Sequence, residues 1–212
     1  MAERDSSMPC DNGHMLILAS ASPRRSELLA NAGFEFQVLS VPVNEQPLVG
    51  ETAGAMVRRL AANKARAAQE AAKSDPRFAN SPTPLLFLGA DTLVTVDGQI
   101  LGKPKDAADA RRMLQLLSGR THQVMTGVAL LAEGVEEIAA ETTEVTFCSL
   151  SLEEIAEYVT TGVPMDKAGA YAIQGYASRW VPRIRGCYFN VVGLPISLVS
   201  ALIEGVAATA AR

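Results

Sequence analysis

The sequence predicts an α/β fold in which helices surround a mixed sheet. Short apolar runs of strand length alternate with amphipathic segments of helical period, which is typical of α/β proteins. Hairpin signals interrupt this alternation, so antiparallel pairs are expected beside the parallel ones. The 212 residues, 48% of them hydrophobic, are enough to bury a full core.

The fold is expected to open with a strand, a tight turn and a helix. Residues 15–19 form a continuous apolar run, as a buried strand does. Ser22 is a good N-cap, Pro23 is favoured at the first helical position, and Gly33 is a natural stop. The polar residues 1–14 before this unit are predicted to be a flexible leader without a secretion signal.

A helix and a hairpin are expected next. Residues 51–73 carry an apolar stripe at helical spacing. Residues 85–96 are predicted to be a strand that turns at Asp97-Gly98 and returns over 99–102. Counting back from that two-residue turn predicts that Thr92 lies opposite Lys103.

The second half of the chain continues the alternation of helix and strand. A helix is predicted over 106–117, followed by strands over 124–131 and 141–150. A capping box at Ser151-Leu-Glu-Glu154 opens a further helix that stops at Gly162. The predicted organisation is one domain over 15–205, followed by an alanine-rich tail over 206–212.

Composition excludes several classes of protein. The net charge of −4 and the absence of a Lys/Arg-rich run argue against a nucleic-acid partner. No apolar stretch reaches the roughly 20 residues of a membrane helix. The three cysteines are few, scattered and odd in number, which suits a reducing, cytoplasmic compartment.

Histidine chemistry is also poorly supported. The chain has only His14 and His122, so a His-rich zinc site is excluded and a Ser-His-Asp triad would depend on His122 alone. Acid–base chemistry is therefore expected from Asp, Glu or Lys.

The start of the first predicted helix is a candidate anion site. Its N-terminus offers free N–H groups and the positive end of the dipole, and Ser20, Ser22, Arg24 and Arg25 stand beside it. The alternative is a capped surface helix with solvated arginines.

A second candidate is Asp91, which interrupts an apolar run and needs a partner such as a metal ion or a lysine. A structural salt bridge is the alternative. Lys64 falls on the apolar stripe of its helix, where it could cover the core or point at Asp91. The segment that holds Lys167 and Gln174 is either a glycine-rich surface loop or a ligand contact, with Gln174 suited to the edge of a base.

Taken together, these segments resemble the Maf family of nucleotide pyrophosphatases. The motifs occur in family order over nearly the whole chain: LASASPRR (18–25), LAANKA (60–65), GADT (89–92), GKP (102–104), LSGRTHQVMTGV (117–128), MDKAGAYAIQG (165–175) and VVGLP (191–195). The AGAYAIQG stretch is similar to the branch that acts on dTTP and UTP.

The resemblance implies two lobes around a central cleft, often in a homodimer, and hydrolysis of a nucleoside triphosphate to the monophosphate and pyrophosphate with Mg²⁺ or Mn²⁺. It implies that Asp91 is the proton acceptor and that Arg24, Thr92 and Gln174 set base specificity. The implied triphosphate-binding residues are Ser20, Arg25, Lys64, Lys103 and Lys167.

One departure concerns the metal. Many relatives carry two adjacent acidic residues where this chain has Asn44-Glu45, so the metal role passes to Glu45, together with Asp91. Two other functions stay open: a nucleotide-sensing regulator of cell division and septum formation, and a 7-methyl-GTP-directed pyrophosphatase. Modified pyrimidine nucleotides are further possible substrates.

Overall fold

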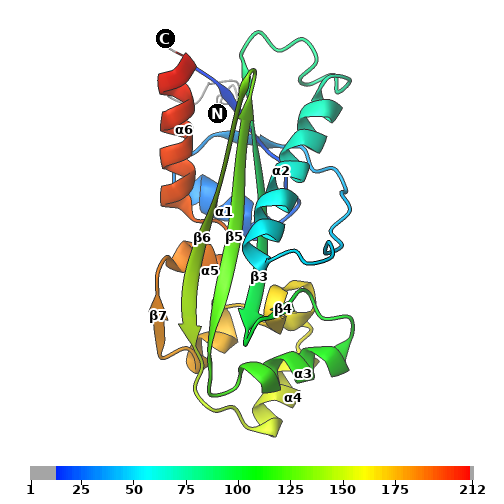
Figure 1. Ribbon diagram of the computed structural model, residues 1–212, viewed down its shortest axis with the longest axis vertical. Helices are drawn as coiled ribbons and strands as arrows, with labels where there is room; N and C mark the ends of the chain where they lie inside the picture. The colour runs from blue at the N-terminus through cyan, green and yellow to red at the C-terminus, as the bar shows by residue number, and fades with distance from the viewer. Residues whose placement is uncertain (1–12, 211–212) are drawn as a thin grey trace, which may run out of the picture.

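The computed structural model describes residues 13–210 and contains one mixed sheet (Figure 1). Its strand order is β2-β1-β3-β5-β6-β7, and β4 pairs with β3 outside this path. The strands are β1 (Met15–Leu18), β2 (Phe36–Val38), β3 (Leu85–Val96), β4 (Gln99–Leu101), β5 (Thr121–Ala132), β6 (Val135–Thr146) and β7 (Arg183–Arg185). The predicted α/β class is confirmed.

Helices lie on both faces of the sheet and at one end of it (Figure 1). They are α1 (Pro23–Asn31), α2 (Ala53–Ala72), α3 (Ala107–Leu117), α4 (Leu152–Thr160), α5 (Tyr188–Val192) and α6 (Ile196–Ala210). Three short 3₁₀ helices connect α4 to β7: η1 (Val163–Asp166), η2 (Ala168–Ala170) and η3 (Gly175–Trp180). The long strands β3, β5 and β6 run from the part that holds α1, α2 and α6 to the part that holds α3 and α4.

Strand β3 is the centre of the fold, and one of its edges is only partly paired. β5 lies along one edge, antiparallel, from Phe87 to Thr95. On the other edge, β1 pairs in parallel up to Leu88, and β4 pairs only from Val94 onward. Between Leu88 and Val94 this second edge has no strand partner in the described part of the chain, so backbone groups there are open to other contacts.

Two glycines let α2 lie directly against the sheet. A Cβ at Gly89 would stand 2.1 Å from the carbonyl oxygen of Ala61, and one at Gly127 would stand 2.2 Å from that of Val57. Real Cβ atoms do not approach backbone that closely, so only glycine fits at these two positions. The close contact brings residues of α2 within reach of side chains on the same face of β3.

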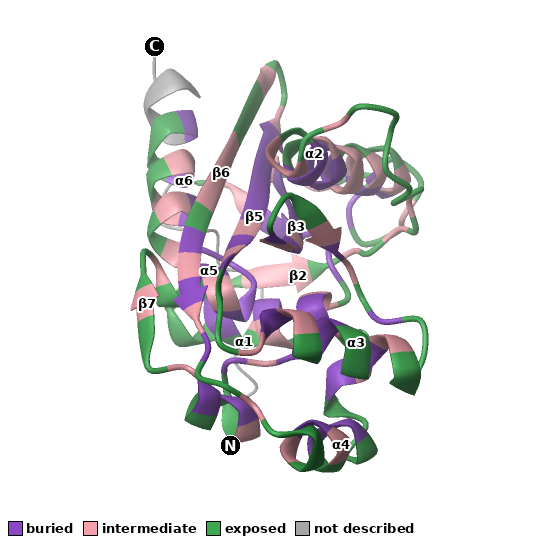
Figure 2. Cartoon of the chain, turned by 60° about the horizontal axis from the view of Figure 1, so that its bottom comes forward, coloured by how far each residue is buried: buried purple, intermediate pink, exposed green. Residues whose placement is uncertain are grey.

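The two faces of the sheet bury separate apolar clusters. α2 covers the side that includes Phe87 and Leu93, whereas Ala90 and Val94 belong to the larger cluster on the opposite side. Successive residues of a strand point to opposite faces, which explains this division. Figure 2 shows β3 and β5 buried over most of their length, while β6 is largely exposed or half-buried.

Several local predictions are confirmed. The hairpin turns at Asp97 and Gly98, whose φ angles of 49° and 76° suit a two-residue turn. The capping box at Ser151 and Glu154 is formed. The helix predicted from residue 106 begins at Ala107, because Asp106 is its N-cap and accepts a hydrogen bond from the Asp109 N–H.

Other local predictions are wrong. Thr92 does not pair with Lys103, since the β3–β4 ladder ends at Val94↔Leu101 and Thr92 lies opposite Thr126 of β5. The start of α1 is as predicted, with Ser22 at the N-cap and Pro23 at the first helical position, and only the expected capping hydrogen bond of the Ser22 side chain is missing. The strand predicted over 141–150 begins earlier and ends earlier, because the β5–β6 hairpin pairs as far as Ala132↔Val135.

The ends of the chain complete the description. The predicted leader falls outside the described residues, apart from positions 13 and 14. The helix α6 continues through the segment predicted to be a tail, as far as Ala210, and Val206 is buried. In the described part of the chain, no helix has the length and apolar character required to cross a bilayer.

Candidate active site

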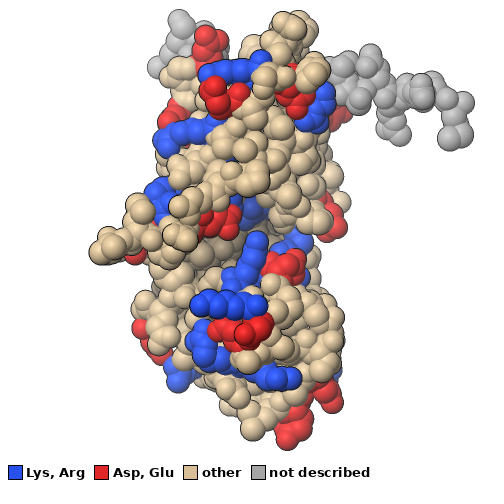
Figure 3. Space-filling model, turned by 90° about the vertical axis from the view of Figure 1, so that its right-hand side faces the viewer, with Lys and Arg blue, Asp and Glu red and all other residues tan. Residues whose placement is uncertain are grey.

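A cleft of about 830 Å³ opens where the edge of β3 has no strand partner. Figure 3 looks onto the side of α2 and shows the surface hollowed at mid-height, with basic and acidic side chains gathered there. Every residue predicted to form the site lines this cleft: Ser20, Arg24, Arg25, Glu45, Lys64, Asp91, Thr92, Lys103, Lys167 and Gln174. The structure therefore brings together residues that are up to 154 positions apart in the chain (20 to 174).

The centre of the cleft holds two carboxylates that share one lysine. Lys64 Nζ lies 2.6 Å from Asp91 Oδ1 and 2.6 Å from Glu45 Oε1. Asp91 is only 7% exposed, so its charge requires a partner, and Lys64 provides one. Asp91 stands on the same face of β3 as Gly89, which explains how α2 comes close enough for this contact.

Glu45 reaches the cleft from the segment between β2 and α2, which has no regular structure. Burial alone would raise the pKa of Glu45, but the hydrogen bond and charge of Lys64, together with Lys103 and Arg25, lower it. The carboxylate is therefore held in its charged form.

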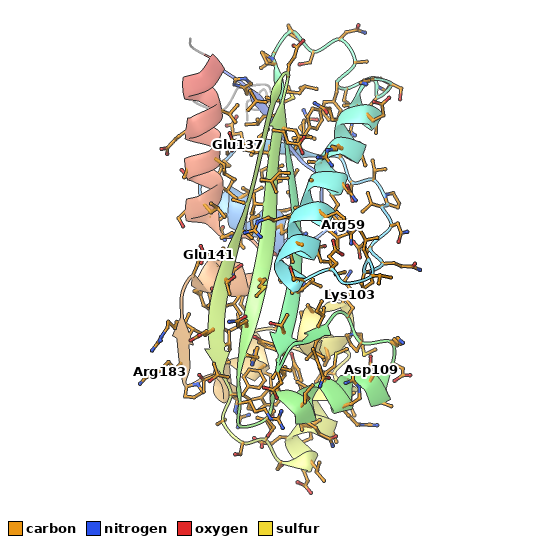
Figure 4. The ribbon with its side chains drawn as sticks, viewed as in Figure 1. Arg59, Lys103, Asp109, Glu137, Glu141 and Arg183 are labelled. Atoms are coloured by element: carbon orange, nitrogen blue, oxygen red, sulfur yellow. The ribbon has the colours of Figure 1, made fainter. Side chains whose placement is uncertain are left out.

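Arg59 of α2 fastens this segment. It donates to both oxygens of Glu51 at 2.6 Å and to the carbonyl of Gln46, next to Glu45, at 3.2 Å. Figure 4 shows Arg59 on α2 and Lys103 in the loop after β4, on the same side of the molecule. The ion pair between Arg59 and Glu51 was not predicted, although Arg59 lies one position before the LAANKA motif.

Arg25 points inward from α1 and lies across the open edge of β3. Its guanidinium donates to four protein oxygens at 2.8–3.1 Å: the carbonyls of Ala90 and Gly193, Ser20 Oγ and Thr92 Oγ1. Burial lowers the pKa of Arg25, and the charge of Asp91 acts in the opposite direction. Arg25 therefore joins α1 to β3 and to the segment that holds Gly193, and it also places a positive charge at the cleft.

The opposite wall of the cleft belongs to η1 and the residues after it. Lys167 Nζ lies 2.5 Å from Asp166 Oδ1 and donates to the carbonyl of Val163 at 2.9 Å. Arg24 reaches across from α1 to Asp166 with a longer contact of 3.5 Å. Burial would raise the pKa of Asp166, but Lys167 and Arg24 outweigh it and lower that pKa. Gln174 is exposed on this wall.

His122 takes no part in the cleft. It is 2% exposed, its ring contacts Phe147 and Tyr171 edge-on, and its Nε2 lies 2.8 Å from the Tyr171 hydroxyl. Burial lowers the pKa of His122 to about 4. This histidine is a core residue, so a triad that depends on it is excluded and acid–base chemistry in the cleft falls to the carboxylates and lysines.

Sequence comparison assigns the chain to a family. The family model described as Maf-like protein matches residues 15–206, almost all of the described fold. The chain belongs to the Maf family. Its seven-stranded mixed sheet, flanked by helices, is consistent with the Maf fold.

Curated Maf relatives match most of the chain at about half identity. A dTTP/UTP pyrophosphatase of Citrifermentans bemidjiense is 53% identical over 183 residues, covering 85% of this chain and 90% of the relative. A dTTP/UTP pyrophosphatase of Koribacter versatilis is 54% identical, and the match covers 88% of this chain and 92% of the relative. A third, from Pseudoalteromonas atlantica, is 47% identical, with 90% and 96% covered.

Proposed function

We propose that this Maf protein is a dTTP/UTP pyrophosphatase, a hydrolase that converts the triphosphate to the monophosphate and pyrophosphate. The observation that carries the proposal is the buried Asp91 beside Lys64 and Glu45, in a cleft that also receives Arg24, Arg25, Lys103 and Lys167. Relatives of about half identity bear the same name. A nucleotide sensor that performs no chemistry has no need of a buried carboxylate at this position.

The basic side chains account for binding of the triphosphate. Lys64, Lys103 and Lys167 come from three separate segments and offset its negative charge, and Arg25 adds a fixed charge behind them. The N-terminus of α1, with Ser20 beside it, offers N–H groups to phosphate oxygens. Hydrolysis of this kind depends mainly on positioning and charge neutralisation, which this arrangement supplies.

Asp91 is the proposed general base. Its carboxylate would take a proton from the water that attacks the α-phosphorus, and pyrophosphate would leave. Lys64 keeps the buried carboxylate paired before the reaction, at 2.6 Å. Arg24, Thr92 and Gln174 would contact the base of the nucleotide, since all three line the same cleft.

The donor chemistry of the cleft fits Mg²⁺ or Mn²⁺. Mg²⁺ is usually held by one or two carboxylates, substrate phosphates and water rather than by a protein cage. Glu45 and Asp91 supply two carboxylates, and residues 13–210 contain no group of three or more acidic, histidine or cysteine side chains arranged to hold an ion. Such an ion, when bound, supplies charge neutralisation on the triphosphate.

The compartment and assembly belong to the same proposal. A cytoplasmic location is supported by the scattered cysteines, of which Cys148 and Cys187 are free. The proposed assembly is a homodimer, on the family resemblance. Size-exclusion chromatography with light scattering measures it directly, and a monomer at micromolar concentration would contradict it.

The deciding experiment is a nucleotide panel with pyrophosphate and monophosphate as the products measured. dTTP, UTP, CTP, GTP, 7-methyl-GTP and pseudouridine triphosphate are each tested with Mg²⁺, with Mn²⁺ and with a chelator. We expect the fastest turnover with dTTP and UTP and loss of turnover with the chelator. Tight binding of dTTP without pyrophosphate release would instead identify a sensor.

A further inference from the structure

Two hydrogen-bonded hydroxyl groups, those of Thr92 and Thr126, lead from the cleft into the core on the opposite face of β3 from Asp91. Thr126 of β5 is 0% exposed and stands directly opposite Thr92. The two side-chain oxygens are 2.9 Å apart. On its far side Thr126 Oγ1 lies 3.2 Å from the backbone carbonyl oxygen of Asn190, which is also buried.

The buried carbonyl decides the direction of these hydrogen bonds. A threonine hydroxyl has one hydrogen to donate and two positions at which it accepts. If Thr126 donates to the Asn190 carbonyl, it must accept from Thr92, and each group then has a partner. If Thr126 instead donated to Thr92, the buried Asn190 carbonyl would lose its donor, which is unfavourable.

If Thr126 donated to Thr92, the Thr92 hydroxyl would also need another acceptor for its own proton, and the one available is poor. Its proton would turn toward the carbonyl oxygen of Gly193, 3.4 Å away. That oxygen already accepts from Arg25 Nε at 2.9 Å. The favoured arrangement is therefore the one in which Thr92 donates away from the cleft, to Thr126.

This direction determines what Thr92 offers to a ligand. Its only proton is committed to Thr126, and one of its acceptor positions receives Arg25 Nη2 at 3.1 Å. Its other acceptor position receives no donor from the described residues, and Thr92 lines the cleft. Thr92 is thus held as a hydrogen-bond acceptor and matches a donor on the substrate.

We propose that Thr126 is a positioning residue for substrate specificity: it orients the Thr92 hydroxyl so that this oxygen accepts from the imide N3–H of thymine or uracil. The inference rests on the proposed function. Thymine and uracil share this N–H, whereas N3 of cytosine is an acceptor and meets the Thr92 oxygen unfavourably. A ribose hydroxyl is the other available donor, but CTP carries it too, so it cannot distinguish UTP from CTP.

The test compares Thr126→Val with wild type in the kcat/KM ratio of UTP to CTP. Valine has nearly the shape of threonine but cannot accept from Thr92. We expect the ratio to fall by about threefold to tenfold, the effect of one neutral hydrogen bond. Thr126→Ser retains the hydroxyl and should keep the ratio within about twofold of wild type. Should Thr126→Val fail to fold, Thr126→Ala removes the same hydroxyl without added bulk, and the same fall is expected.

Thr143→Val is the matched control. Thr143 is also 0% exposed and bonds to the Asn190 side chain at 2.9 Å, but it does not contact Thr92. The Thr143→Val variant should be less stable than wild type but keep the wild-type kcat/KM ratio of UTP to CTP. It therefore separates a general effect of disturbing these hydrogen bonds from the specific effect of losing the Thr126 hydroxyl.

Three results would overturn the inference: an unchanged UTP to CTP ratio in the folded Thr126 variants, an equal fall in Thr143→Val, or a fall confined to the ratio of UTP to 3′-deoxy-UTP. The last would assign the donor to the ribose. Failure of the wild-type protein to release pyrophosphate from any pyrimidine triphosphate would instead contradict the proposed function.

Discussion

At the scale of single residues, charge pairing explains why polar groups are found inside this protein. Asp91 and Arg25 are both nearly buried, and each is surrounded by partners of the right kind. Asp91 has one cation at close range and reaches the cleft, which suits a reacting group. Arg25 has four protein acceptors, which suits a residue that also holds the structure together.

Replacing Asp91 by Asn should lower kcat for dTTP by about 100-fold or more, because the amide cannot take the proton from water. The measurement is steady-state pyrophosphate release. Asp97→Asn is the control, since Asp97 sits in the exposed β3–β4 turn at a φ that asparagine accepts. Near-wild-type turnover in Asp91→Asn would remove the base assignment.

Arg25→Lys and Arg24→Lys form a second pair of matched variants. A lysine cannot reproduce the planar fork that serves four acceptors, so Arg25→Lys should lower the free energy of unfolding by about 2–4 kcal/mol. Arg24 makes a longer contact of 3.5 Å, with the exposed Asp166, and its replacement should change stability by less than about 0.5 kcal/mol. Urea unfolding gives both values, and equal effects of the two substitutions would refute the structural role of Arg25.

At the scale of elements, the site depends on how α2 is seated on the sheet. Lys64 reaches Asp91 only because the backbone of α2 rests on Gly89 and Gly127. The segment with Glu45 is in turn fastened to α2 through Arg59. Displacing this helix would therefore disturb binding of the triphosphate and stability together.

Gly127→Ala tests this seating. The added Cβ would lie 2.2 Å from the carbonyl oxygen of Val57, and backbone must move, so we expect a loss of about 1–3 kcal/mol or more in unfolding free energy. Gly54→Ala in the same helix is the control, because its Cβ meets only Arg58 Nη1, at 3.4 Å, and alanine favours helix by up to about 1 kcal/mol. Chemical denaturation of both variants makes the comparison. A neutral Gly127→Ala would show that α2 is not held so closely.

At the scale of the whole molecule, one buried histidine links folding to pH. The pKa of His122 is about 4 in the folded protein because of burial, and about 6.5 when the chain is unfolded. Below about pH 6.5 the His122 imidazole is protonated in the unfolded chain, whereas in the folded protein it stays neutral down to about pH 4. Stability should therefore be highest above pH 6.5 and fall by up to about 3 kcal/mol as the pH drops through this window.

Urea unfolding between pH 7 and pH 5 checks this dependence in wild type and in His122→Phe. Phenylalanine keeps a ring against Phe147 and Tyr171 but does not titrate. The slope of unfolding free energy against pH should be smaller in the variant, whatever its absolute stability. Parallel slopes in the two proteins would contradict the assignment.

Much of the local structure could be predicted from the sequence. The β3–β4 turn, the helices around residues 53–72 and 152–160, and the buried carboxylate at Asp91 all follow from local patterns of few residues. Turn and capping preferences act between neighbours, and hydrophobic period marks the buried face of an element, so both are visible in the chain itself.

Other features were missed because their partners are distant in the chain. Strands β2 and β7 have only three residues each and exist through pairing with β1 and β6. Helix α5 was likewise not predicted, although its Asn190 supplies the carbonyl that orients Thr126. A polar residue within the apolar run 124–131 was the one local signal for Thr126.

The sequence by itself determined which charged groups are present, most of the long helices and strands, and membership of a family whose motifs span the chain. Only the tertiary structure decided where these groups meet. The cleft exists because β1 and β4 leave part of one edge of β3 unpaired, and this gap gives access to Asp91 on one face and Thr92 on the other. Pairing of this kind is a property of the whole sheet, so no local pattern could specify it.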